Sequence, residues 1–175
     1  MTPGGKSRVP MTVTFFEMTA KPSALPPPQP KGRHAILKAE NPSPEFYRFL
    51  YDQIGGPYKW VDRKKLTPEA LTEIIRHPRN VLYVLYVEGC PAGMAELDLR
   101  KDGVANISYF GLMPDFIGKR LGYFFLYHAC QNAWAHPISR LTINTCTLDH
   151  PRALPLYQRI GFTAYAREER FVELP

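Results

Sequence analysis

Apolar and polar residues alternate in short runs along much of this chain, a pattern typical of β-strands that are buried on one face. Three such runs follow one another in the middle of the sequence: 80–89, 90–103 and 104–114. Glu88-Gly89 and Asp102-Gly103 lie between them, and both dipeptides are typical of tight hairpin turns. The pattern therefore predicts a three-stranded antiparallel meander.

Shorter runs predict more strands, at 11–20, 33–40, 140–149 and 162–174. The last run is long enough to bend into two strands. Between the first two lies a segment with five prolines, 21–32, which we interpret as an extended connector.

Helical spacing predicts a first helix over 41–56. Ser43 is a good N-cap, and Pro44 suits the first helical position. Gly55-Gly56 ends the helix. Its apolar face is expected to consist of Phe46, Phe49, Leu50 and Ile54.

Three further helices are expected. The segment 67–78 begins with Thr67 as its cap, and a third helix runs from about 119 to 135. In the fourth, over 150–160, Asp149 is the expected cap and Gly161 the expected end.

The order of strand, helices, meander, helix, strand, helix and strand predicts an α/β (α+β) fold with a mixed sheet and helices on its faces. We expect a flexible leader at 1–10 and a single domain over 11–175. No internal repeat is visible in the 175 residues.

Composition agrees with an ordinary globular protein, since 45% of residues are hydrophobic and 22% are charged. The sequence contains no run of about 18 apolar residues, which a membrane-spanning helix would need. Its N-terminus lacks the pattern of a signal peptide. The odd number of cysteines, three, without a CxxC pair indicates reduced thiols in a cytoplasm rather than structural zinc.

The formal net charge of +6 could attract nucleic acid or a polyanionic small ligand. The basic residues are dispersed, and no helix carries a continuous basic stripe. We therefore favour a phosphorylated cofactor over nucleic acid.

The stretch DFIGKRLGYFF, from Asp115 to Phe125, follows a predicted strand and leads into a helix. Gly118 and Gly122 bracket its basic residues. Turns of this kind offer backbone N–H groups to a phosphate, although the glycine spacing is not that of a P-loop or a dinucleotide fingerprint.

Two motifs, YFGLMPDFIGKRLGYFFL and TCTLDHPRALPLYQRIGF, together resemble the GNAT superfamily of acetyl-CoA-dependent N-acetyltransferases, and in particular a set of bacterial GNAT proteins of unassigned substrate. In the first motif Ile117 stands at the superfamily's Gln/Arg position, Arg120 at its first Gly and Gly122 at its second. In the second, His150 takes the place of an Asn. The matching residues there are Ala153, Tyr157, Gly161 and Phe162.

The resemblance implies a twisted, largely antiparallel sheet with helices on both faces and a splayed central strand pair. It also implies acetyl-CoA as co-substrate, with its pantetheine held by strand backbone and its pyrophosphate by the turn. The implied coenzyme-binding residues are Leu112, Met113, Ile117, Gly118, Lys119, Arg120, Leu121, Gly122 and His150.

Arg120 leaves two outcomes open. If its backbone needs no positive φ, its side chain can reach a phosphate; if it needs glycine geometry, the loop must distort. His150 is either a coenzyme donor or an ordinary first-turn residue.

Tyr157 is the general acid that the resemblance implies for the departing thiolate, the alternative being a core tyrosine. Glu96 is either the general base, with a pKa raised by burial, or an outward-facing strand carboxylate. Asn106, where some relatives have a Glu, cannot take a proton, so a water relay to Glu96 or Asp98 would be needed. Cys146 fits inert packing better than a nucleophile.

Acceptor contacts are expected from the loop after the first helix, where Tyr58 and Trp60 lie near Asp62 and could hold a cationic amine. Trp60 could instead anchor the loop to the core.

The function predicted is acetyl transfer to a primary amine of a small molecule or peptide, by direct attack in a ternary complex and without a metal. The alternatives are a non-catalytic acyl-CoA-binding or sensing protein and a basic nucleic-acid-binding protein. A homodimer is left open.

Overall fold

The computed structural model describes residues 7–174. The strands are β1 (Arg8–Met18), β2 (His34–Lys38), β3 (Asn80–Val87), β4 (Cys90–Asp98), β5 (Val104–Leu112), β6 (Arg140–Cys146) and β7 (Thr163–Glu173). The helices are α1 (Pro44–Gly55), α2 (Pro68–Ile75), α3 (Leu121–Trp134) and α4 (Ala153–Ile160). Short 3₁₀ turns are η1 (Gly56–Tyr58), η2 (Arg63–Lys65) and η3 (Pro114–Phe116).

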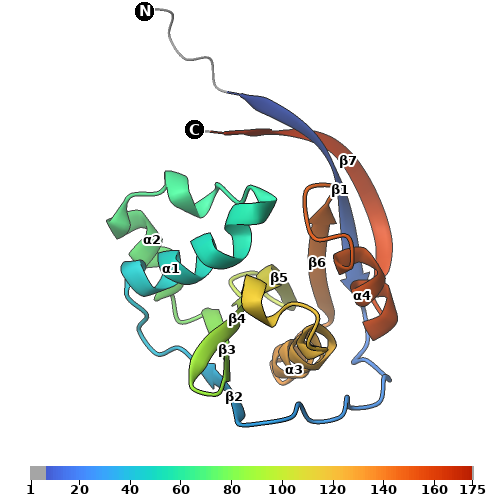
Figure 1. The fold of residues 1–175 in the computed structure, drawn as a ribbon. Coiled ribbons are helices and arrows are strands. Elements are labelled where there is room, and N and C mark those ends of the chain that lie inside the picture. Colours follow the sequence, from blue (N-terminus) through green and yellow to red (C-terminus); the bar gives the residue numbers. More distant parts are fainter. Residues whose placement is uncertain (1–6, 175) are drawn as a thin grey trace, which may run out of the picture.

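The strands form one seven-stranded sheet in the order β2-β3-β4-β5-β6-β1-β7 (Figure 1). Every neighbouring pair is antiparallel except β5 and β6, which are parallel. The predicted mixed, largely antiparallel sheet is confirmed, including the meander β3-β4-β5.

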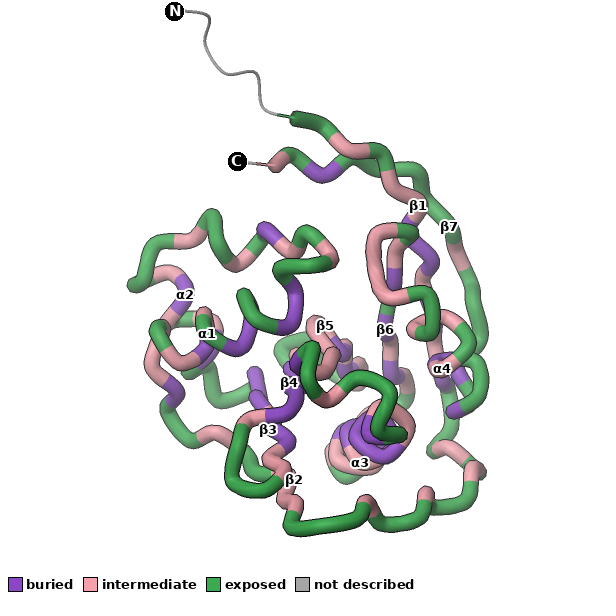
Figure 2. Tube along the Cα trace, in the orientation of Figure 1, coloured by how far each residue is buried: buried purple, intermediate pink, exposed green. Residues whose placement is uncertain are grey.

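Helices cover both faces of the sheet. One face carries α1 and α2, whose buried side chains pack with Leu82, Val84 and Met94. The other face carries α3 and α4, which enclose residues such as Phe16 and Ile107. Figure 2 shows the buried positions gathered along the central strands and within α3, whereas β7 is exposed over most of its length.

The capping predictions for the first two helices are confirmed, because Ser43 accepts from the N–H of Phe46 and Thr67 from the N–H of Ala70. The predicted buried face of α1 was partly wrong, since Phe49 is 49% exposed. The buried stripe instead runs through Tyr47, Leu50, Tyr51 and Ile54. These positions follow the i, i+3, i+4, i+7 spacing, from which residue 49 is displaced around the helix.

The chain enters the sheet earlier than predicted, because β1 begins at Arg8 rather than Met11. Pro10 is tolerated there: it pairs with Phe171 of β7, while the pairing with β6 starts only at Val13. The rest of the predicted leader, residues 1–6, lies outside the described residues.

The predicted cap of α4 was also wrong. The helix begins at Ala153 with Arg152 before it, and the Asp149 side chain accepts hydrogen bonds from Thr145 and Cys146 instead. Pro151 disfavours a helical backbone at His150, which delays the start of the helix and leaves the Asp149 carboxylate outside it.

Candidate active site

The site begins where β5 and β6 part. Their parallel pairing covers only Val104–Ile107 against Arg140–Ile143, although β5 continues to Leu112 and β6 to Cys146. Figure 1 shows the two parts of the sheet on either side of this divergence, β2–β5 with α1 and α2 and β6-β1-β7 with α4. The predicted splayed strand pair is therefore present.

The end of β5 turns backbone groups toward the opening. The N–H of Met113 is donated to the carbonyl of Ala92 on β4, at 2.8 Å. Because hydrogen-bonding direction alternates along an antiparallel ladder, Leu112 and Phe110 direct their N–H and C=O groups away from β4, to the side that β6 has left. Of the two predicted backbone donors, Leu112 faces the opening, whereas the N–H of Met113 is already engaged.

The turn between β5 and α3 ends at an uncapped helix N-terminus. Arg120 precedes the helix with φ +61°, and Gly118 has φ +83°. Among the described residues, no side chain caps the first turn of α3, so its N–H groups, from Leu121 onward, point out of the helix without a partner. Such a terminus attracts an anion through both its N–H groups and the helix dipole.

Three elements meet at Gly122. A Cβ built on this glycine would lie 3.7 Å from Cδ2 of Leu156 on α4 and 4.0 Å from Cδ1 of Leu112 on β5. Nearby, the Arg159 guanidinium lies 4.3 Å from the ring centroid of Tyr123, joining α4 to α3. The turn between β5 and α3, the open end of β5 and α4 thus surround one region.

The remaining turn residues have modest local roles. The Ile117 side chain is 37% exposed, and its N–H is donated to the carbonyl of Pro114 at 3.2 Å. The Lys119 ammonium lies 5.0 Å from the ring centroid of Phe116. His150 accepts from the N–H of Arg152 at 3.1 Å, which serves the turn that leads into α4.

Tyr157 lies in α4 on the same side as α3. Only 5% of the residue is exposed, and its ring packs edge-on against Phe16 at a centroid distance of 5.8 Å. Burial raises the pKa of its hydroxyl, and the Asp149 carboxylate raises it further. The hydroxyl therefore remains protonated at neutral pH.

Glu96 is neither a free base nor an outward-facing carboxylate. It is fully buried and forms an ion pair with Arg63 at 2.6 Å, and it also accepts from Tyr47 and, at 3.3 Å, from Asn80. Burial alone would lower the pKa of Arg63, but Glu96 and Tyr47 raise it above its usual value. The sequence could not reveal this partner, which is 33 positions away.

Asp98, the other carboxylate of the predicted water relay, is also engaged by an arginine. Hydrogen bonds from Arg100 lower the pKa of the Asp98 carboxyl, and the two side chains lie 2.7 Å apart. Asn106 is engaged with Thr142 at 2.8 Å and with Ser108 at 3.2 Å. Both carboxylates of the relay are therefore tied to arginines.

Cys146 is a poor nucleophile. Burial raises the pKa of its thiol, and the nearby Asp149 carboxylate adds to the shift. The preference for inert packing over nucleophilic catalysis agrees with this environment.

The loop after α1 holds the three residues that were predicted to contact the acceptor, Tyr58, Trp60 and Asp62. The Trp60 ring occupies the space that a side chain at Gly55 would take. It lies between the rings of Tyr51 and Tyr109, at centroid distances of 5.4 and 5.1 Å. The aromatic ring thus anchors the loop to the core, as one of the two interpretations held. Asp62 is exposed. Burial raises the pKa of the Tyr51 and Tyr109 hydroxyls, and Asp62 lies close enough for its charge to raise both further.

Sequence reasoning missed Asp149 as a site residue. The indole N–H of Trp60 is donated to Oδ1 of Asp149 at 3.3 Å, which connects the loop after α1 to the loop after β6. The Tyr58 ring lies 6.2 Å from that of His150, in the same corner. The signal in the sequence was ambiguous, because an Asp before a helical segment usually indicates a cap.

A model of the acetyltransferase (GNAT) family matches residues 42–162, which is more than half of the chain. The chain belongs to the GNAT acetyltransferase family. All the predicted site residues lie within the matched range. No curated protein matches this GNAT chain.

Solved structures share the fold at low sequence identity. A GCN5-related N-acetyltransferase from Kribbella flavida is 18% identical, with a TM-score of 0.60 over 93% of this chain and 60% of that one. A tandem GNAT protein from the clavulanic acid biosynthesis pathway is 14% identical, with a TM-score of 0.67 over 95% and 54%. An aminoglycoside acetyltransferase from an uncultured soil metagenomic sample is 11% identical, with a TM-score of 0.59 over 73% and 87%.

The GNAT chain spans less than two thirds of the first solved structures that it matches, at 62%, 52% and 60% of their lengths. Within residues 7–174, no group of three or more His, Cys, Asp and Glu side chains is placed to hold a metal ion. In the same part of the chain, no helix has both the length and the apolar character to cross a membrane.

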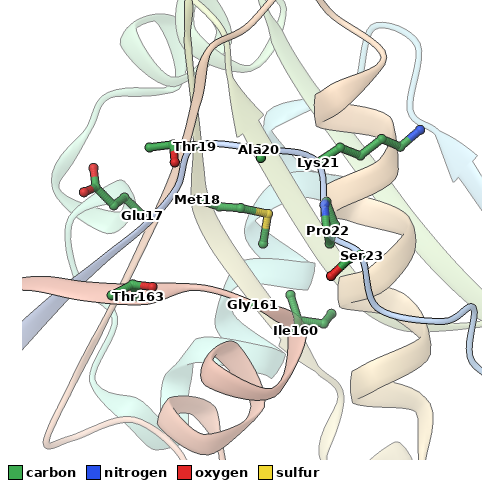
Figure 3. Close-up of a pocket in the computed structure, with 10 residues that line it drawn as sticks. All are labelled: Glu17, Met18, Thr19, Ala20, Lys21, Pro22, Ser23, Ile160, Gly161 and Thr163. Carbon is green, nitrogen blue, oxygen red and sulfur yellow. The ribbon is translucent and has the colours of Figure 1, made fainter.

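A separate hollow of about 430 Å³ lies where β1 leads into the proline-rich connector (Figure 3). It is lined by Glu17, Met18, Thr19, Ala20, Lys21, Pro22, Ser23, Ile160, Gly161 and Thr163. None of these residues belongs to β5, α3 or the turn between them, so the hollow is distinct from the site described above.

Glu96→Gln is expected to lower the free energy of unfolding by about 3 kcal/mol, because it leaves the largely buried Arg63 without its counter-charge. Urea unfolding followed by circular dichroism measures this. Glu168→Gln removes an exposed ion pair with Arg170 and should change stability little. Full stability with loss of activity in Glu96→Gln would instead support a catalytic base.

Arg120→Gly is expected to raise the free energy of unfolding by up to about 1 kcal/mol, since a left-handed backbone is unfavourable for any residue with a Cβ. Lys119→Gly is the matched control, because Lys119 is not among the positive-φ residues and should lose stability. If both variants lose stability equally, Arg120 contributes contacts that outweigh its backbone strain.

Proposed function

We propose that this GNAT protein transfers an acetyl group from acetyl-CoA to a primary amine of a small molecule or peptide, by direct attack in a ternary complex. The observation that carries the proposal is the meeting of the open end of β5, the uncapped N-terminus of α3 and α4 around Gly122. A ligand that combines an extended amide-bearing arm with a pyrophosphate matches both kinds of backbone group.

The coenzyme would be held mainly by backbone. The N–H groups from Gly118 to Gly122 suit the pyrophosphate, and the N–H and C=O of Leu112 suit the amides of the pantetheine arm. Unpaired strand groups are unfavourable unless a ligand satisfies them, so we infer that the coenzyme completes the sheet at the divergence. Lys119 adds positive charge at the same turn. Arg120 has a left-handed backbone, which is the second of its two predicted outcomes, so we assign it no phosphate contact.

The bound acetyl-CoA supplies an activated thioester. The nitrogen lone pair of the acceptor forms the C–N bond as the C–S bond breaks, and the hydroxyl of Tyr157 donates its proton to the departing sulfur. The position of Tyr157 in α4 supports this role, because it lies close enough to Asp149, in the loop after β6, for that carboxylate to influence its ionisation.

A second candidate is a non-catalytic acyl-CoA-binding or sensing protein. The observation that favours it is that Glu96 and Asp98 are both held by arginines and offer no free base. Thiol release from acetyl-CoA with a panel of amines separates the two functions. Binding of acetyl-CoA without thiol release for any amine supports the sensing function.

Gly122→Ala is expected to leave stability unchanged but to weaken coenzyme A binding roughly tenfold, the value of one good hydrogen bond. The added methyl group would make only ordinary contacts with Leu156 and Leu112, yet it would stand beside the first-turn N–H groups. Isothermal calorimetry measures the affinity. Gly56→Ala, where the new Cβ meets nothing within 4 Å, is the matched control; equal affinities would place the pyrophosphate elsewhere.

Tyr157→Phe is expected to lower kcat roughly 100-fold or more while coenzyme A affinity is retained. Because burial raises the pKa of Tyr157, the wild-type rate should show no alkaline decline from this group up to pH of about 10. Stopped-flow or steady-state thiol release tests both points. Tyr127→Phe, which alters another buried tyrosine of the same core cluster, should keep full activity.

A further inference from the structure

The Asp149 carboxylate links the end of β6 to the loop after α1. Trp60 reaches it from the side of α1, and Tyr157 lies close enough on the side of α4 for Asp149 to influence its ionisation. The carboxylate therefore lies between the loop expected to contact the acceptor and the expected proton donor to the sulfur.

The two oxygens of Asp149 are used unequally. Oδ2 accepts from the hydroxyl of Thr145 at 2.8 Å and from the N–H of Cys146 at 2.9 Å. Oδ1 accepts only the 3.3 Å bond from the Trp60 indole among the described residues. One oxygen is thus fixed in position, while the other keeps capacity for a further donor.

Asp149 also lacks a counter-charge. Among residues 7–174, no Lys, Arg or His side chain forms a salt bridge with it, in contrast to Glu96 and Asp98. The carboxylate is only partly exposed, and the neighbouring side chains of Tyr58 and Trp60 are aromatic. A half-buried anion beside aromatic rings favours a cationic ligand.

We propose that Asp149 holds the ammonium group of the acceptor and removes its proton, and that the acceptor is a cationic primary amine whose carbon body lies against Tyr58 and Trp60. This inference rests on the proposed acetyl transfer and specifies its acceptor half. Asp149 thereby takes the role that the sequence had assigned to Glu96, and the anionic role assigned to Asp62.

The protons balance. Of the three on the ammonium nitrogen, one passes to Asp149 and on to solvent, and one stays on the amide product. The third leaves as the C–N bond forms and replaces the proton that Tyr157 gives to the sulfur. The net products are the amide, free coenzyme A and one proton.

Trp60 provides a direct probe of this corner. The chain has two tryptophans, and the indole N–H of Trp134 is buried without a hydrogen-bond partner. Trp134→Phe should therefore be tolerated, and it leaves Trp60 as the sole tryptophan. Its fluorescence is titrated with 2-phenylethylamine and with the uncharged 2-phenylethanol, on protein saturated with coenzyme A so that no turnover occurs.

The amine is expected to give a saturable change with an affinity at least about tenfold higher than the alcohol, as a charge-assisted hydrogen bond requires. Asp149→Asn should reduce the amine to the affinity of the alcohol, because Asn retains an oxygen for Thr145 and Cys146 but turns a donor toward the ammonium and the Trp60 indole. Amine and alcohol are compared within the variant, so the lost indole bond affects both alike. In turnover assays the same variant should lower kcat/KM for the amine by a larger factor than it lowers the affinity, because the variant loses the proton acceptor as well as the ammonium contact.

Three controls locate the effect. Asp52→Asn changes an exposed carboxylate on α1 and should preserve the preference for the amine. Asp62→Asn should also preserve it. Coenzyme A binding, measured by calorimetry, should be the same in Asp149→Asn and the parent.

The outcomes are distinct. Absence of coenzyme A binding in the parent overturns the proposed function itself. If coenzyme A binds normally, three results overturn the assignment of Asp149. These are no fluorescence response to the amine, equal affinities for amine and alcohol, and an intact preference for the amine in Asp149→Asn. Loss of the preference in Asp62→Asn alone transfers the role to Asp62.

Discussion

The structure depends on one constraint: β5 and β6 stay paired for only the first part of their length. Each strand then follows its other neighbour, β5 along β4 and β6 along β1, so the sheet remains continuous at one end and opens at the other. The opening leaves backbone groups of β5 without a strand partner, and such groups favour any ligand that can pair with them. The N-terminus of α3 and the residues around Asp149 both lie next to this opening, so a ligand bound there would contact both.

Side-chain contacts fix the structure on both sides of the opening. On the side of α1, the buried ion pair of Glu96 and Arg63 fixes the loop after α1 to β4, and Trp60 is packed between two tyrosines. On the side of α4, the Asp149 carboxylate is fixed by Thr145 and Cys146. The hydrogen bond between Trp60 and Asp149 connects the two sides. Trp60 therefore anchors its loop and also helps to position the Asp149 carboxylate.

Much of the fold could be predicted from local patterns. Alternation identified the strands, the dipeptides Glu88-Gly89 and Asp102-Gly103 identified the hairpins, and Ser43 and Thr67 identified helix starts. The errors arose where two local rules conflicted. Phe49 is apolar but lies off the buried stripe of α1, and Asp149 is a good cap but precedes a proline that delays the helix.

The sequence by itself determined the family, the order of the elements and the turn between Gly118 and Gly122, because these depend on residues close together in the chain. Tertiary structure alone decided which carboxylate has an arginine as counter-charge. The sequence favoured Glu96 as a base and Asp149 as a helix cap, but Glu96 meets Arg63 and Tyr47 in the core, whereas Asp149 meets the indole of Trp60, 89 positions away. The charge that surrounds a side chain depends on long-range packing, and no local pattern encodes it.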